Sequence, residues 1–524
     1  MSDLDTMMQV RAWSAGRAIA TAEALPWPRA SASSVMILAF VRMAGEATPW
    51  GFAIGAPGQE PQIVTVPDPR DQNASANLCV ELSSALLEHV GHPVFASRGE
   101  PPTDAARMQL WVPGATHLDA LHLLALRYNR ARHGTREHIT ALRRLARAAG
   151  YLFRESRRPG QLRVFDASAK LRECFAFPGE PLRQQHLGYL LSWLRPTPDA
   201  TNNERARREE LAEIAERETI SWTLDPELEE RELEPLLTAL DSAKKAQQPT
   251  DDLVDAIHSV LEPELARRWK LCEEAWRLLD RDDRPSNRFL EPLEVLARDE
   301  HQWQYANTEK KLVDVDESQD ETGVFVIDPE TDRSPAAASH RYWSSVRSAD
   351  LAADLVHGDR WMLARLVADG AALEGTVRSV RAAKRGRATE IRWEIVCSSA
   401  IATKFREGSD VAMHSLPKRT ATIVSIDERE DERVIVLEIT GWKNERVAER
   451  VAAASDRGYE RQRVAFVAPT LPELSLRKAT QCWNSDGPGA WLTHARSKPA
   501  PARPTAPTDT GAAQALLALV ERHR

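Results

Sequence analysis

Residues 371–396 read AALEGTVRSVRAAKRGRATEIRWEIV, and in this stretch the hydrophobic pattern of the chain changes from a helical period to an alternating one. More short apolar runs, separated by polar turns, follow as far as Thr440. Runs of this kind are typical of β-strands joined by tight turns. The expected strands are Glu374–Val377, Thr389–Val396, Phe405–Val411, Ala421–Ile426 and Arg433–Ile439. The stretch therefore predicts a small β-barrel at residues 371–443, a module that usually serves as a binding platform.

Basic side chains gather at the predicted turns of this barrel. They neutralise phosphates well, and binding of that kind depends on salt but not on sequence. Trp393 is the candidate for stacking on a base. The basic candidates are Arg378, Arg381, Lys384, Arg385 and Arg387 around the first hairpin turn, and Lys404, Arg406, Lys418 and Arg419 in later turns. The alternative is a hairpin tip that only aids solubility, with Trp393 in the core, and the acidic turn Asp427–Glu432 weighs toward it.

Length and composition limit the class of protein. A chain of 524 residues exceeds what one hydrophobic core supports, so two to four domains are expected. Hydrophobic residues make up 42% and charged residues 28%, and no apolar stretch approaches the roughly 20 residues that span a bilayer. The first twenty residues lack the pattern of a secretory signal. These features predict a cytoplasmic protein without a membrane partner.

The five cysteines are far apart and form no Cys-x-x-Cys pair, which argues against disulfides and against a structural zinc site. A net charge of −8 excludes a uniformly basic surface. Local patches matter more than the total for nucleic-acid binding, so that function stays open.

The N-terminal region has three short apolar runs, at 34–42, 50–55 and 62–66, followed by a helix, a strand and a helix. This order resembles that of a ribonuclease-H-like domain with a mixed sheet. Two-metal hydrolysis needs several carboxylates, yet the first run contains none. The sequence thus predicts a degenerate domain with no catalytic residue, metal or cofactor. Glu81, Glu88 and Asp119 are the candidates for the alternative, a metal-dependent nuclease.

The expected fold class is a multidomain α+β protein. Its parts are a ribonuclease-H-like α/β domain (1–133), a helical domain (134–310), an acidic linker (311–340), a helical stalk (341–370), the barrel (371–443), a return segment (444–496) and a Pro-rich tail with a short helix (497–524).

The order of these parts resembles the region that precedes the motor in superfamily 1 helicases of the 5′-to-3′ branch. The resemblance rests on three pieces. They are Leu110-Trp111-Val112 with the helix that follows, the barrel segments Leu373–Val377, Phe405–Val411 and Thr422–Ile426, and the segment Val467–Thr470.

In that family a glutamine ahead of the phosphate loop contacts adenine, and Gln514 is the position that matches. The chain has no G-x-x-x-x-G-K-[ST] loop, so the resemblance implies a motor on another polypeptide. The leading hypothesis is a non-catalytic accessory part of a split or truncated helicase that binds single-stranded nucleic acid. The alternatives are the nuclease and a helical scaffold for protein interaction.

Overall fold

The structure is a computed structural model. It describes residues 3–44, 48–90, 108–132, 134–195, 204–217, 221–281, 285–300, 335–385, 388–430, 432–440 and 458–469. Two compact units divide the chain, one of Met1–Pro329 with Ser345–Pro472 and one of Glu330–Ser344 with Glu473–Arg524. Both the sheet and the barrel described below belong to the first unit. Most of the predicted linker, Arg387, Gln514 and the tail lie outside the described residues.

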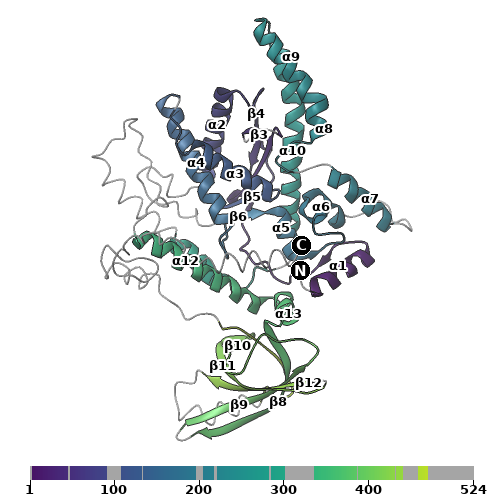
Figure 1. Cartoon of the computed structure of the whole chain (residues 1–524), viewed down its shortest axis with the longest axis vertical. Coiled ribbons are helices and arrows are strands. Elements are labelled where there is room, and N and C mark those ends of the chain that lie inside the picture. The colour runs from purple at the N-terminus through teal and green to yellow at the C-terminus, as the bar shows by residue number, and fades with distance from the viewer. Residues whose placement is uncertain are drawn as a thin grey trace, which may run out of the picture. The chain divides into compact units, whose positions relative to one another are not determined.

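A five-stranded mixed sheet forms the N-terminal core, in the order β4-β3-β2-β5-β6 (Figure 1). Strands β2, β3 and β4 form an antiparallel meander, and β5 and β6 add to β2 in parallel. Nearly every residue of β2 is buried, as expected for a central strand that is covered on both faces. The strands are β2 (Val35–Arg42), β3 (Pro49–Gly55), β4 (Gln62–Thr65), β5 (Gln109–Val112) and β6 (Val164–Asp166).

Helices cover both faces of this sheet (Figure 1). The long helix α10 (Asp251–Arg281) lies against β2, β3 and β4. Its apolar stripe Leu265, Trp269, Cys272 and Trp276 is buried. The Trp269 indole donates to the carbonyl of Ile37 at 3.2 Å. On the other side lie α2 (Gln72–Val90), α3 (Ala115–Tyr128) and α4 (Arg136–Ser156).

The predicted boundary at residue 133 does not separate two domains in the structure. Strand β6 lies inside the range that was expected to be helical, and it completes the sheet by pairing with β5. Helix α10 buries its apolar stripe on that same sheet, while α4 packs on α2 and α3 and meets β6. The region expected as a helical domain therefore shares one core with the residues before it.

Shorter elements complete the described part of the first unit. Asp225 caps the helix that begins with Pro226 by accepting from the Glu227 amide at 2.9 Å. The remaining elements before the barrel are α1 (Asp3–Ala15), β1 (Ile19–Ala20), η1 (Ala32–Ser34), α5 (Ala167–Cys174), β7 (Phe175–Ala176), η3 (Arg183–Gln185), α6 (Leu187–Leu194), α7 (Glu204–Arg217), α8 (Pro226–Leu228), η4 (Glu229–Leu233), α9 (Glu234–Lys245), α12 (Pro335–Asp354), η6 (Leu355–Gly358) and α13 (Arg360–Ala368).

The predicted barrel is present and closed, in the order β10-β11-β12-β9-β8-β13. Its last strand, β13, was expected in the return segment, but it pairs with β8 and β10 and closes the barrel. Bulges in β8 and β11 supply the bends that a small barrel needs. The strands are β8 (Ala372–Arg385), β9 (Ala388–Ser398), β10 (Asp410–Met413), β11 (Leu416–Glu428), β12 (Glu432–Thr440) and β13 (Arg463–Val467).

Gly370 stands where α13 ends and the barrel begins, as the sequence predicts. Its φ of +69° is a left-handed conformation that side chains disfavour. A Cβ at this position would also lie 2.4 Å from the carbonyl oxygen of Ala402.

No helix in the part of the chain that the structure describes is long and apolar enough to cross a membrane.

Candidate nucleic-acid interface

Strand register collects basic residues at one end of the barrel. Arg381 pairs with Arg392, which pairs in turn with Glu438, and one row further on Ile439 ends the pairing of β9 with β12. Beyond that row, β8 and β9 continue to the hairpin turn. On the other side of β12, β11 begins at Leu416, a few residues before Thr420, which is the partner of Thr440. We call this end the basic end, with positions Arg381, Lys384 and Arg385 of β8 and Lys418 and Arg419 of β11.

The acidic turn lies at the opposite end of the barrel. Glu432 pairs with Ser398, the last residue of β9, whereas Thr389 at the other end of β9 pairs with Lys384. At about 3.3 Å per residue, Thr389 and Ser398 are about 30 Å apart along the strand. That separation is nearly four Debye lengths at physiological salt, so the acidic turn barely weakens the potential at the basic end.

Arg378, predicted as a phosphate contact, belongs to the acidic end instead. Its guanidinium lies 2.9 Å from Glu432 and 3.3 Å from Glu394. The hydrogen bond between Arg378 and Glu432 raises the pKa of the arginine and lowers the pKa of the carboxyl. Arg429 also pairs with Glu432, at 3.2 Å. Arg378 thus neutralises its own carboxylates rather than a ligand.

Lys404 and Arg406 are exposed, but they lie away from the basic end. Both belong to the loop between β9 and β10. The Lys404 amide donates to the carbonyl of Gly370, two residues before β8 begins. The Arg406 amide donates to Ser409 Oγ at 3.0 Å. The predicted cations therefore do not form one patch.

Within the described residues, Arg381 is exposed and makes no ion pair. Arg392, beside it in the ladder, was not among the predicted residues and pairs with Glu438 at 3.6 Å. The alternation Ile391-Arg392-Trp393-Glu394 could have revealed it, since residues of one parity face outward. Arg381 is the described member of the basic end whose charge is least compensated.

The prediction that Trp393 stacks on a base is wrong, because the structure places this side chain in the barrel core. Trp393 is 0% exposed. Its ring packs 5.0 Å from Tyr459 and 6.2 Å from Phe466, measured between ring centroids. The alternative interpretation, a core tryptophan, is the correct one.

The end of β2, where a ribonuclease-H-like active site would lie, is filled by the protein itself. Pairing of β2 with β5 stops at Ile37, and beyond it the Phe40 amide donates to Nδ1 of the fully buried His117 at 3.1 Å. The Arg42 amide donates to the Trp222 carbonyl at 2.7 Å, and Trp222 is buried. In open α/β sheets ligands bind at such strand ends, and here the buried Trp222 lies at the end of β2.

The carboxylates proposed for a nuclease are not assembled. Glu81 and Asp119 are exposed on α2 and α3, and the side chain of Glu88 lies outside the described residues. Among the side chains that the structure describes, no three histidine, cysteine, aspartate or glutamate residues are grouped to hold a metal. The geometry offers the nuclease hypothesis no support.

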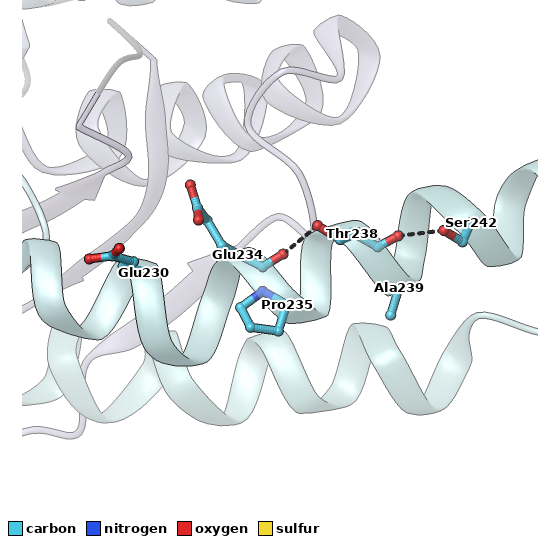
Figure 2. A pocket seen from close by; sticks show the side chains of 6 residues that line it. All are labelled: Glu230, Glu234, Pro235, Thr238, Ala239 and Ser242. Atoms are coloured by element: carbon cyan, nitrogen blue, oxygen red, sulfur yellow. Dashed lines mark hydrogen bonds between the residues drawn. The ribbon is translucent and has the colours of Figure 1, made fainter.

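An open depression of about 500 Å³ runs along α9 (Figure 2). Thr238 and Ser242 each donate to the carbonyl four residues earlier, so their hydroxyls are satisfied within the helix. Glu230 and Glu234 supply negative charge, which excludes a phosphate ligand. The lining residues are Glu230, Glu234, Pro235, Thr238, Ala239 and Ser242.

Comparisons of this chain with protein-family models, with curated proteins and with solved structures gave no match.

Proposed function

We propose that this protein is a nucleic-acid-binding accessory factor whose barrel contacts phosphate groups through the basic end. One observation carries the proposal. The register of β8, β9, β12 and β11 brings Arg381, Lys384 and Arg385 to the same end as Lys418 and Arg419, and it leaves the acidic turn at the other end. Contacts to phosphates supply most of the affinity of sequence-independent binding.

The proposal extends to a partner with motor activity. A meander of three strands, followed by two parallel strands with helical crossovers, supports a ribonuclease-H-like sheet. The buried Trp222 at the end of β2 supports a structural rather than a hydrolytic role for this sheet. A degenerate ribonuclease-H-like domain, followed by a barrel with a basic end, is the order of parts that resembles the region preceding the motor in superfamily 1 helicases. We infer that the protein delivers nucleic acid to a helicase motor, in DNA or RNA processing or in defence.

Binding to a labelled single-stranded oligonucleotide, followed by fluorescence anisotropy at several salt concentrations, tests the proposal. With five phosphate contacts, raising salt from 50 to 200 mM should weaken binding about 100-fold. The triple variant Arg381→Ala, Lys384→Ala, Arg385→Ala should flatten the slope of log affinity against log salt by about 2.

The matched control is Lys404→Ala with Arg406→Ala, which removes two exposed cations at the other end of the barrel. It should change the affinity less than about twofold, because those cations lie more than a Debye length from the basic end. Equal losses in the two variants, or salt-independent binding by the unmodified protein, would overturn the assignment of the interface.

A further inference from the structure

The segment Leu355–Asp359, of sequence LVHGD, joins the sheet-containing core to the barrel, and several of its polar groups bond outside the segment. Asp359 is 2% exposed. One carboxylate oxygen accepts from the amides of Glu23 and Ala24 at 2.9 and 3.1 Å, and the other accepts from the first turn of α13. A single carboxylate thus caps α13 and ties it to the N-terminal segment.

Asn287 also attaches the segment Leu355–Asp359, which we call the joint, to the core. Its Nδ2 donates to the carbonyl of Leu355 at 2.7 Å, while its Oδ1 accepts from the Phe289 amide at 3.0 Å. Gly358 packs against it so closely that an added Cβ would lie 2.1 Å from Oδ1. The joint is therefore attached to the core by amide and carboxylate groups.

Two histidines attach the joint to the barrel, and their bonds are reciprocal. His357 Nδ1 donates to the carbonyl of His414 at 2.8 Å, and His414 Nε2 donates to the carbonyl of Val356 at 2.7 Å. The ring centroids are 5.6 Å apart. Beneath them lies an apolar cluster of joint, helix and barrel residues, namely Val356, Leu363, Ala372, Ala465 and Val467. We call the two histidines with their bonds the histidine clasp.

We propose that the histidine clasp is a pH-sensitive connection that holds the barrel to α13 when both rings are neutral and releases it when they become protonated. Each ring already uses one N–H to donate to a carbonyl, so the proton added in acid goes to the remaining nitrogen. Two imidazolium groups at this separation repel each other in a partly buried site. Because the attachments on the core side involve no histidine, acid would open the barrel side first.

The charged groups around the clasp act in both directions. His357 faces Asp354 of α12, with its Nε2 3.7 Å from the carboxylate, and it also faces Arg288. His414 faces Glu374 of β8, Arg360 of α13 and Arg288. The two carboxylates favour protonation, and the two arginines oppose it. Burial outweighs both and lowers the pKa of each histidine below the ordinary value of 6.5.

The sign of the pH effect follows from these lowered pKa values. Between the folded and the unfolded pKa, the released state binds more protons than the clasped state. The clasp therefore contributes its full stability above pH 6.5, and that contribution falls as the pH drops below this value.

Amide hydrogen exchange of the full chain between pH 8 and pH 5, corrected for the intrinsic rate, tests the clasp. Acidification should speed exchange in residues 355–368 by about tenfold, while the central sheet stays protected. In the variant His357→Asn with His414→Gln, the amide nitrogens can take the places of Nδ1 and Nε2 without titrating. This variant should remain closed across the whole range.

A pH response of the double variant equal to that of the unmodified protein would refute the clasp, as would an unmodified protein whose joint shows no response. If the double variant does not fold, His414→Gln alone provides the test, because it alters only the less buried ring. It should shift the opening to lower pH, and an unshifted transition would count against the proposal.

Discussion

Replacing Trp393 with alanine is expected to destabilise the barrel by about 3–5 kcal/mol, a large fraction of the 5–15 kcal/mol that stabilises an ordinary domain. The side chain is fully buried, and it packs against Tyr459 and Phe466. Truncation would leave a cavity in a small closed core whose paired strands cannot easily collapse into it. The chain has 15 tryptophans, so intrinsic fluorescence would not isolate the barrel. Amide exchange in β9 and β12 is the suitable measurement.

The variant Trp393→Phe separates a core role from a nucleic-acid contact. Phenylalanine keeps an apolar ring in the core, so the loss of stability should be about 1–3 kcal/mol. Nucleic-acid affinity should stay unchanged at temperatures where the barrel is folded, because the tryptophan offers no face to a base. A folded Trp393→Phe protein with tenfold weaker binding would contradict the buried position.

Replacing Arg268 with alanine should destabilise the sheet-containing core by about 3–5 kcal/mol. Arg268 on α10 is 0% exposed, and burial lowers its pKa to about 10, so it stays protonated at neutral pH. Its guanidinium bonds the carboxylate of Glu264 and the carbonyl of Ser221. That carbonyl directly precedes Trp222, so the arginine helps to hold Trp222 at the end of β2. Its loss would leave the partly buried Ser221 carbonyl without this donor, and Glu264 with only the more exposed Arg267 as its cation.

Arg267 provides a matched control one residue away. It bonds the same Glu264 oxygen at 2.8 Å, but it is partly exposed, so Arg267→Ala should change the free energy of unfolding by about 0–1 kcal/mol. Urea denaturation of both variants gives the comparison. Adding Glu264→Gln to Arg268→Ala should recover part of the loss, since it removes a carboxylate that has lost its buried partner. Equal stability of the two arginine variants would show that the burial of Arg268 contributes nothing.

Local patterns predicted much of the fold correctly. The alternation of apolar and polar residues located β8, β9, β11 and β12, because a strand that is buried on one face must alternate. The apolar stripe of α10 follows from the helical period, which places residues three to four apart on the same face of the helix. The same parity rule places Trp393 with Ile391, Ile395 and Cys397 on the inner face, and all four are buried. The stacking hypothesis for Trp393 could therefore have been rejected from the sequence.

The parts that depend on distant pairing were not predictable in this way. Strand β6 is three residues long, too short to show a period, and only its pairing with β5 makes it part of the sheet. Strand β13 lies in the range expected as a return segment, and its place in the barrel depends on Val467 meeting Ala372, far away in the chain. Local patterns carry no information about which distant strand becomes the neighbour. The sequence therefore did not reveal that one sheet continues past residue 133, or that the barrel closes with a strand beyond residue 443.

The sequence by itself determined where this protein changes from helices to a barrel, and which residue types the barrel carries. The tertiary structure decided which of those charges meet. Arg378 and Arg381 are three residues apart, yet Arg378 is neutralised at the acidic end and Arg381 remains exposed toward the basic end. The physical reason is that a charge is neutralised by its neighbours in space, and strand register sets those neighbours by pairing residues that lie far apart in the chain.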